Sequence, residues 1–399
     1  MSAASSYTCL QKRIKLPDEV RIAQCRAAPQ LGPKILFFSG GSALKPLSKN
    51  LISYTYNSCH IVTPFDSGGS SAKLREAFQM PAVGDIRNRL MALADQSITG
   101  NPEICSLFAH RLPAKAKRQD LIRELQEMAR GRHQLVAKVP EAMRGIIRHH
   151  LQYFLKHMPP EFDPQGASIG NLILAAGYLE QERNLDPVIY IYSKLAEVRG
   201  GVRPVVNQNL HLFARLEDGQ LLKGQHLLTG KHAPPISSPV QEVYLCHHSG
   251  QPAPAKITDN IKKLITAADL ICYPMGSFYS SLIANLLPQG IGSAVASTSC
   301  PKVYIPNPYS DPESYGLDLN QQILTLLAYL QKDQDLPANQ QPFLDYILLD
   351  EDPDLYPGSL DIDLLQELNI EVLRCRLVTA ESAPRIEPSS LLQILLSLT

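Results

Sequence analysis

The chain has 399 residues, and its 38 Lys and Arg side chains balance 38 Asp and Glu side chains, so the formal net charge is zero. A dedicated nucleic-acid-binding protein needs a cationic surplus, which this balance argues against. No apolar run reaches the roughly 18 residues that span a membrane, and the N-terminus lacks the pattern of a secretory signal. The eight cysteines form no C-x-x-C pair. We therefore expect a cytoplasmic protein with no nucleic-acid and no membrane partner.

The N-terminal part of the chain predicts the start of a parallel sheet. An apolar run at 34–38 is closed by the Gly- and Ser-rich residues 39–42, which is typical of a buried parallel strand that leads into a helix, here expected over 45–54. A second strand is expected over 59–62. A strand, a helix and a strand at this spacing form a right-handed βαβ unit. Residues 1–33 are aperiodic and are interpreted as an N-terminal extension without regular structure.

The middle of the chain adds helices and a hairpin. Residues 86–95 and roughly 101–160 follow a helical period, and the second stretch is interpreted as a helical insertion. Ser168 is expected to cap a further helix. Between 209 and 223, apolar and polar residues alternate about Asp218-Gly219. This pattern predicts a β-hairpin, so we expect the sheet to contain antiparallel strands.

A regular alternation of strands and helices returns in the C-terminal part. No Gly- or Ser-rich linker and no internal repeat interrupts residues 34–399. The chain therefore predicts a single α/β domain with a mostly parallel, doubly wound sheet. Strands are expected over 269–273, 292–296, 302–305, 345–349 and 370–377, and helices over 258–268, 278–287, 361–368 and 389–398.

Charge is distributed unevenly although the total cancels. Residues 111–156 are markedly basic, whereas residues 303–373 contain a single cation, Lys332, among many carboxylates. The basic stretch is open to two interpretations. It can form a rim that attracts an anionic ligand, or it can be the solvated face of surface helices, which is the commoner role of such runs.

The strongest candidate for a binding site follows the second predicted strand. Asp66-Ser67 is followed at once by Gly68-Gly69-Ser70-Ser71 and then by a helical segment. Glycines let a ligand approach the backbone, and successive N–H groups at a helix start can hold phosphate oxygens. A neighbouring carboxylate is well placed to hold Mg²⁺. The alternative is an Asx-turn that only starts a helix.

Three further segments could contribute to the same site. Gly40-Gly41-Ser42 follows the first predicted strand, and Gly276-Ser277 follows the strand at 269–273. Ligands of open α/β sheets bind at the carboxyl ends of the strands, so these loops are expected to form a composite phosphate site with Gly68–Ser71. Asn171, at the start of a helix, offers an amide that can recognise a ligand. Taken alone, each loop can equally be a tight turn, and Asn171 can be a structural cap.

These residues together resemble the CofD-like superfamily, which includes 2-phospho-L-lactate transferase and the gluconeogenesis factor branch. The resemblance runs in consistent order from about residue 34 to the C-terminus. It rests on residues 40–42, 61–75, 84–88, 92–95, 170–172, 268–269, 276–281, 307 and 313–316.

The resemblance implies a Rossmann-like, three-layer α/β/α fold. In the transferase branch it implies transfer of a phospholactyl group from a guanosine diphosphate adduct to a deazaflavin, with Mg²⁺, in the synthesis of coenzyme F420. In the other branch it implies a UDP-sugar-binding regulator of carbon and cell-wall metabolism. It also brings Asp85 and Asn88 into the expected ligand site. Both branches handle a nucleotide diphosphate, which is the expectation that transfers most directly.

This chain departs from the family pattern at several positions of the expected site. The regulator-type pattern has two Asp residues where this chain has Asp66-Ser67, and a common Glu after the hairpin is Gln225. The third loop has Pro274-Met275 before Gly276 where Gly-Pro is usual. These changes predict a remodelled pocket, so the known substrates of the family do not transfer with the fold.

Two functions from different classes are therefore expected. The first is a Mg²⁺-dependent transferase that uses a GDP- or UDP-type ligand. In it Asp66 binds the metal or orients the acceptor, and Arg75 or Arg87 balances the charge that develops on phosphoryl transfer. The second is a non-catalytic sensor of a nucleotide sugar. A pocket that has lost its function is a third interpretation, and a homodimer is a possible assembly.

Overall fold

The computed structural model describes residues 14–97, 100–230, 234–333 and 342–399. Its centre is a seven-stranded sheet with the strand order β10-β9-β8-β7-β1-β2-β3, in which all neighbouring strands run parallel. The strands are β1 (Ile35–Ser39), β2 (Cys59–Val62), β3 (Gly201–Pro204), β7 (Leu270–Tyr273), β8 (Lys302–Tyr304), β9 (Tyr346–Asp350) and β10 (Glu371–Cys375).

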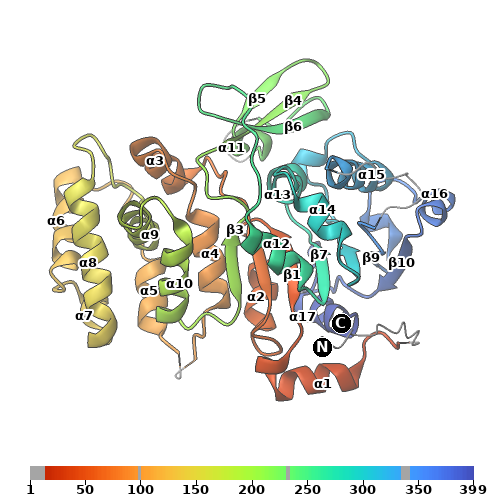
Figure 1. Ribbon diagram of the computed structural model, residues 1–399, viewed down its shortest axis with the longest axis horizontal. Coiled ribbons are helices and arrows are strands. Elements are labelled where there is room, and N and C mark those ends of the chain that lie inside the picture. The colour runs from red at the N-terminus through yellow and green to blue at the C-terminus, as the bar shows by residue number, and fades with distance from the viewer. Residues whose placement is uncertain (1–13, 98–99, 231–233, 334–341) are drawn as a thin grey trace, which may run out of the picture.

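Two layers of helices cover this sheet, as expected of a three-layer α/β/α fold (Figure 1). Alternate residues of β1 point to opposite faces, so Ile35 and Phe37 pack in one core and Leu36 and Phe38 in another. The first core contains residues of α1 (Glu19–Ala27), α2 (Lys45–Leu51) and α17 (Pro388–Ser397). The second contains residues of α12 (Asp259–Thr266), α14 (Ile291–Ala296), α15 (Leu319–Gln331) and α16 (Ile362–Glu367).

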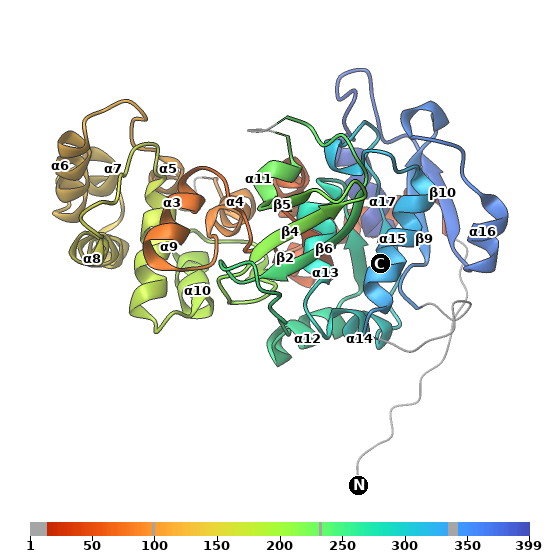
Figure 2. The same ribbon diagram turned by 90° about the horizontal axis from the view of Figure 1, so that it is seen from above.

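The helices between β2 and β3 form a third core at one end of the molecule (Figures 1 and 2). Aromatic and aliphatic side chains of these helices pack beside Val62 of β2 and Val202 of the edge strand β3. The stretch expected to be helical, 101–160, is helical with short connections and contains α5 to α8. All the helices between β2 and β3 are α3 (Gly69–Phe78), α4 (Gly84–Leu93), α5 (Pro102–Ala109), α6 (Arg118–Ala129), α7 (Gln134–Ala137), α8 (Glu141–His157), α9 (Ile169–Glu180) and α10 (Leu185–Leu195).

The predicted hairpin is present, but it does not belong to the main sheet. β4 (His211–Leu216) and β5 (Leu221–Lys223) pair antiparallel, and β6 (Val240–Cys246) pairs with the other side of β4. Gly219 takes the positive φ of 86° that the turn requires. The expectation of antiparallel strands within the main sheet is therefore wrong, because these strands form a separate three-stranded sheet.

Two further expectations about local structure are wrong. Residues 292–296 lie in α14 and not in a strand, because a short apolar run fits a buried helix as well as a buried strand. The N-terminal extension was expected to lack regular structure, yet it contains α1. Asp18 caps that helix by accepting hydrogen bonds from two backbone N–H groups, and Ile22 and Cys25 bury its apolar side. Residues 1–13 of that extension lie outside the described part of the chain.

Within the residues that the structure describes, we find no helix with both the length and the apolar character needed to cross a bilayer.

Candidate functional site

The strand order places a topological switch point between β1 and β7, where the chain leaves toward β2 and returns toward β8. Crevices for ligands form at such points, outside the carboxyl ends of the strands. A cleft of about 750 Å³ lies there. It is lined by Gly40, Gly41, Ser42, Asp66, Gly68, Gly69, Ser70, Ser71, Asp85, Arg87, Asn88, Asn171, Gly276 and Ser277. Of the residues that the sequence singled out for the site, only Arg75 is not in this lining.

The loop after β2 contains both structures that the sequence allowed, an Asx-turn and a glycine-rich helix start. Asp66 forms an Asx-turn, since its Oδ1 accepts a hydrogen bond of 3.0 Å from the backbone N–H of Gly68. Gly68 then occupies the N-cap of α3, and Gly69 takes a positive φ of 53°. The first-turn N–H groups of α3 thus begin at the cleft, beside the Asp66 carboxylate. This arrangement suits an anion and its accompanying cation.

Arg75 holds this loop in place from a buried position outside the lining of the cleft. Its side chain is 4% exposed and donates to the carbonyl oxygens of Phe65, Asp66 and Leu210. Burial lowers the pKa of Arg75 to about 10, so the guanidinium stays charged at neutral pH. Because carbonyl oxygens of the protein already accept its N–H groups, Arg75 fixes the loop after β2 in place. It has no direct access to a ligand in the cleft.

The loops after β1 and β7 bring the backbone close to its neighbours. A Cβ atom on Gly40 would overlap the Ser281 hydroxyl, and one on Gly41 would overlap the Asp85 carboxylate. Gly276 has a φ of 146°, and its N–H donates to Asn307 Oδ1 at 3.0 Å while its carbonyl accepts from Asn307 Nδ2 at 2.6 Å. Glycine is therefore required in both loops to keep the walls of the cleft in place.

Arg87 reaches the cleft from α4. Its guanidinium donates to Ser168 Oγ and, at 2.5 Å, to Asn88 Oδ1, while its Nε has no hydrogen-bond partner among the described residues. Burial and the charge of Arg111 lower the pKa of Arg87 to about 10. Ser168 lies at the N-cap of α9 as predicted, but its side chain makes no capping hydrogen bond. Its Oγ instead accepts from Arg87 and donates to the carbonyl oxygen of Phe108.

Several residues of the cleft were not chosen as site residues from the sequence. They include Gln225 and His226 of α11 (Gln225–Leu228), the exposed Tyr309, and Arg111 and Arg385. These side chains come from segments far apart in the chain, and none belongs to a recognisable motif. Two signals were available: Gln225 was noted as a departure from the family pattern, and Arg111 begins the basic stretch that was interpreted as a rim for an anionic ligand.

A buried carboxyl group holds the segment that follows the third loop. Glu313 is fully buried, and its Oε2 accepts from the backbone N–H of Ser280 at 2.7 Å. Its Oε1 lies 2.5 Å from Ser280 Oγ. Burial, with a smaller contribution from the Asp311 charge, raises the pKa of Glu313 to about 8. The group is therefore mostly protonated at neutral pH, and it links 312–314 to the helical turn at 278–283.

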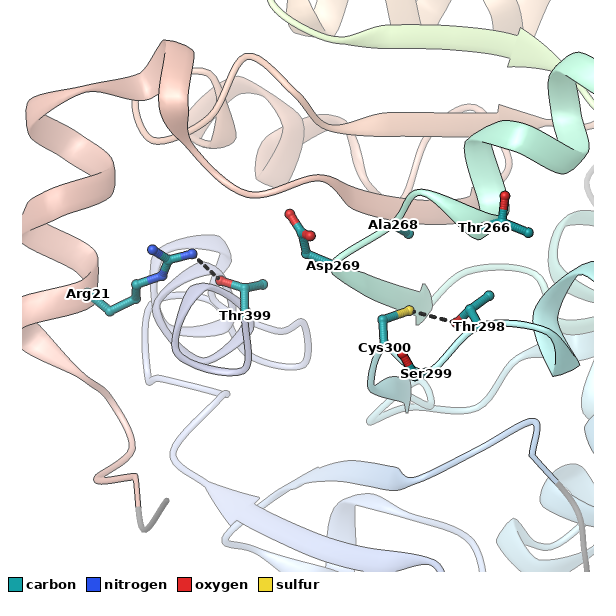
Figure 3. Close-up of a pocket in the computed structure, with 8 residues that line it drawn as sticks. All are labelled: Arg21, Thr266, Ala268, Asp269, Thr298, Ser299, Cys300 and Thr399. Carbon is teal, nitrogen blue, oxygen red and sulfur yellow. Dashed lines mark hydrogen bonds between the residues drawn. The ribbon is translucent and has the colours of Figure 1, made fainter. Parts of the chain in front are cut away.

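A second cavity of about 440 Å³ opens at the amino ends of β7 and β8 (Figure 3). Several of its polar groups already bond to the protein, although Arg21 Nε has no partner among the described residues. Asp269 accepts from the N–H of Lys34 at 2.8 Å, Arg21 donates to Thr399 Oγ1, and Cys300 Sγ lies 3.0 Å from Thr298 Oγ1. Because it faces away from the loops at the carboxyl ends of the strands, this cavity is the weaker candidate.

The cleft offers oxygen ligands to a metal ion only in part. Among the described residues, no group of three or more His, Cys, Asp or Glu side chains is arranged to hold a metal. Mg²⁺ often needs only one or two carboxylates, because phosphates and water complete its octahedron. The Asp66 carboxylate beside the N–H groups of α3 fits such a shared site.

Comparisons with known proteins agree on one family. A family model described as "2-phospho-L-lactate transferase CofD" matches residues 35–378. The chain is 30% identical to the gluconeogenesis factor of Bacillus subtilis over 362 residues, which cover 87% of this chain and 92% of that protein. It is 28% identical over 373 residues to a putative gluconeogenesis factor of Nostoc, covering 92% and 68% of the two chains. A crystal structure of a UPF0052 family member from Bacillus halodurans superposes with a TM-score of 0.65 at 23% identity, over 92% of this chain and 99% of that one.

Proposed function

Because the chain belongs to the 2-phospho-L-lactate transferase CofD family, we propose that it is a Mg²⁺-dependent transferase that acts on a nucleotide-diphosphate-linked substrate. The observation that carries the proposal is the position of Asp66. Its carboxylate stands beside the N–H groups that begin α3, at the switch point of the sheet. A diphosphate needs both hydrogen-bond donors and a cation, and this loop offers the donors together with a ligand for the cation.

Each part of the cleft then has a chemical role. The backbone of Gly68–Ser71, with the loops at Gly40–Ser42 and Gly276–Ser277, holds the phosphate oxygens. Arg87 Nε, a buried donor without a partner among the described residues, adds a hydrogen bond from a charged group. Mg²⁺, when bound, neutralises phosphate charge during transfer. Phosphoryl transfer depends on positioning and charge balance, so the reaction does not require a nucleophile on the protein.

A second function is supported by the relatives. The Bacillus subtilis protein at 30% identity is named a gluconeogenesis factor. This chain would then be a non-catalytic sensor of a nucleotide sugar that uses the same cleft without an acceptor.

A thermal-shift screen with GDP, GTP, UDP-sugars and a deazaflavin, with and without Mg²⁺, separates the two functions. Stabilisation by UDP-sugars without turnover supports the sensor, and a response to guanine nucleotide with turnover of a deazaflavin supports the transferase. No response to any compound indicates a pocket that has lost its function.

Asp66→Asn tests the metal role directly. Asparagine keeps a side-chain oxygen for the N–H of Gly68 but removes the charge, so the Asx-turn persists while a Mg²⁺ ligand is lost. We expect the gain in nucleotide affinity on adding Mg²⁺ to fall at least about tenfold in calorimetric titrations. Asp363→Ala, on an exposed position of α16, is the control. An unchanged response to Mg²⁺ in Asp66→Asn contradicts the assignment.

A further inference from the structure

Two residues that line the cleft carry a buried hydrogen-bond acceptor without a partner among the described residues. Asn171 is 1% exposed, and its Nδ2 donates to Ser70 Oγ at 2.9 Å. Its Oδ1 is buried and has no hydrogen-bond partner among the described residues, and the same is true of Gln225 Oε1. Both residues line the cleft. Buried polar atoms are nearly always paired in folded proteins, so two unpaired oxygens in one cleft indicate groups that a ligand completes.

His226 adds a third polar atom to this wall. Its Nδ1 lies 2.7 Å from Ser67 Oγ, which also accepts from the backbone N–H of His226 at 3.2 Å. His226 lines the cleft, whereas Ser67 is not among its lining residues. The roles in the Ser67–His226 contact depend on the tautomer: when Nδ1 carries the proton, Ser67 Oγ accepts both N–H groups and Nε2 is left as an acceptor.

The backbone at Gly224 leaves room for this pair. Its φ of 110° lies in the region that favours glycine. A Cβ atom there would approach Ser67 Oγ to 2.9 Å and His226 Nδ1 to 3.0 Å. A larger residue at position 224 would therefore push against the Ser67–His226 contact. Glycine at this position lets the backbone before α11 hold the imidazole against Ser67.

The polarity of this wall identifies the chemistry of its ligand. Ionised phosphate oxygens carry no protons, so they cannot donate to Asn171 Oδ1, Gln225 Oε1 or His226 Nε2. Hydroxyl groups can donate to all three. We propose that Asn171, Gln225 and His226 form a hydroxyl site, which binds a hydroxyl-bearing part of the substrate next to the phosphates. The inference rests on the proposed function, because that function places the phosphates over Gly68–Ser71.

The hydroxyl groups can come from two sources. They can belong to a sugar joined to the nucleotide diphosphate, or to a separate alcohol that receives the transferred group. Titration calorimetry on the full chain with Mg²⁺ distinguishes the two. The probes are UDP against UDP-glucose, GDP against GDP-mannose, and glycerol added to the protein saturated with UDP or GDP. A gain of about tenfold for a nucleotide sugar over its nucleotide indicates the first source, and glycerol binding to the loaded protein indicates the second.

Variants test whether the proposed residues cause the gain in affinity that the hydroxyl groups provide. Gln225→Met keeps the length of the side chain and removes the acceptor, so we expect it to abolish most of the gain while affecting the nucleotide alone less. Ser67→Ala, which frees the imidazole, should reduce the gain in part. Gln220→Met, on an exposed position of the hairpin, is the matched control. Melting temperatures of all variants show that they are folded.

The outcomes separate this inference from the function beneath it. Nucleotide binding with no gain from either source of hydroxyl groups overturns the hydroxyl site and leaves the proposed function intact. A gain that persists in Gln225→Met and Ser67→Ala overturns the assignment to these residues. If no nucleotide binds, the proposed function fails and the inference fails with it.

Discussion

Among the glycines that line the cleft, Gly41 leaves the least room for an added side chain. A methyl group there would overlap the Asp85 carboxylate, so Gly41→Ala must move the Asp85 side chain, α4 or the loop after β1. We expect a loss of about 1–3 kcal/mol in the free energy of unfolding, measured in urea, together with weaker nucleotide binding. Gly145→Ala is the control, because nothing lies within 4 Å of its Cβ and alanine favours the interior of α8. Equal stability of the two variants would contradict the steric explanation.

Residue by residue, the sequence located the loops that line the cleft but not the contacts that support them. Gly68–Ser71 and Asp66 could be found because a short run contains both the flexible backbone and the carboxylate. Arg75 belongs to the same run, but its guanidinium turns toward Leu210. The contact between Ser67 and His226 joins residues 159 positions apart, and no local pattern encodes such a distance.

Among the elements, the turn at 278–283 depends on a carboxyl group that is protonated in the fold. The pKa of Glu313 rises from an ordinary value of 4.5 to about 8, chiefly because the group is buried. The folded protein therefore binds one more proton than the unfolded chain between these two values. This contribution to stability is complete below pH 4.5 and is lost as the pH rises toward 8.

Glu313→Gln tests this link between 278–283 and 312–314. Glutamine resembles the protonated acid but does not ionise, so the variant should lose stability less steeply than the original chain between pH 5 and 8. The difference in slope is expected to be at most about 1.4 kcal/mol per pH unit, measured by urea unfolding at a series of pH values. Parallel curves for the two proteins would show that Glu313 does not titrate differently on unfolding.

Elements with a strong local signal were predicted with nearly correct bounds, and elements defined by distant contacts were not. β2 was expected over 59–62 and is found there, because a short apolar run lies between polar residues. The short strand β3 has no such signal and was not predicted, since it exists by pairing with β2. The helix at 291–296 was assigned to a strand because its apolar residues fit either structure.

In the molecule as a whole, α4 belongs both to the lining of the cleft and to the third core, which contains the helical insertion. Asp85, Arg87 and Asn88 line the cleft from one side of α4, while Ile86 and Leu90 pack in the core of the insertion. A change in that core is therefore expected to shift α4 and so to alter the cleft. Because packing in a shared core does not by itself establish that the core and the cleft are coupled, this coupling needs a direct test.

Phe154→Ala provides that test. Phe154 is fully buried in α8 and makes edge contacts with Phe78 and Phe162, with ring centroids 5.7 and 5.6 Å apart. Removing the ring should cost about 3–5 kcal/mol. We expect faster hydrogen exchange in α4 as well as in α6–α8, and a fall in nucleotide affinity of about three- to tenfold as the binding-competent population decreases.

Leu326→Ala is the matched control, because Leu326 is equally buried in α15, on the far side of the sheet from the insertion. It should accelerate exchange around α15 and leave the exchange of α4 as it was. If Phe154→Ala instead confines faster exchange to α6–α8 and binds nucleotide as before, the insertion opens without moving α4. The insertion would then be an attachment at the β3 edge of the sheet and not a support for the cleft.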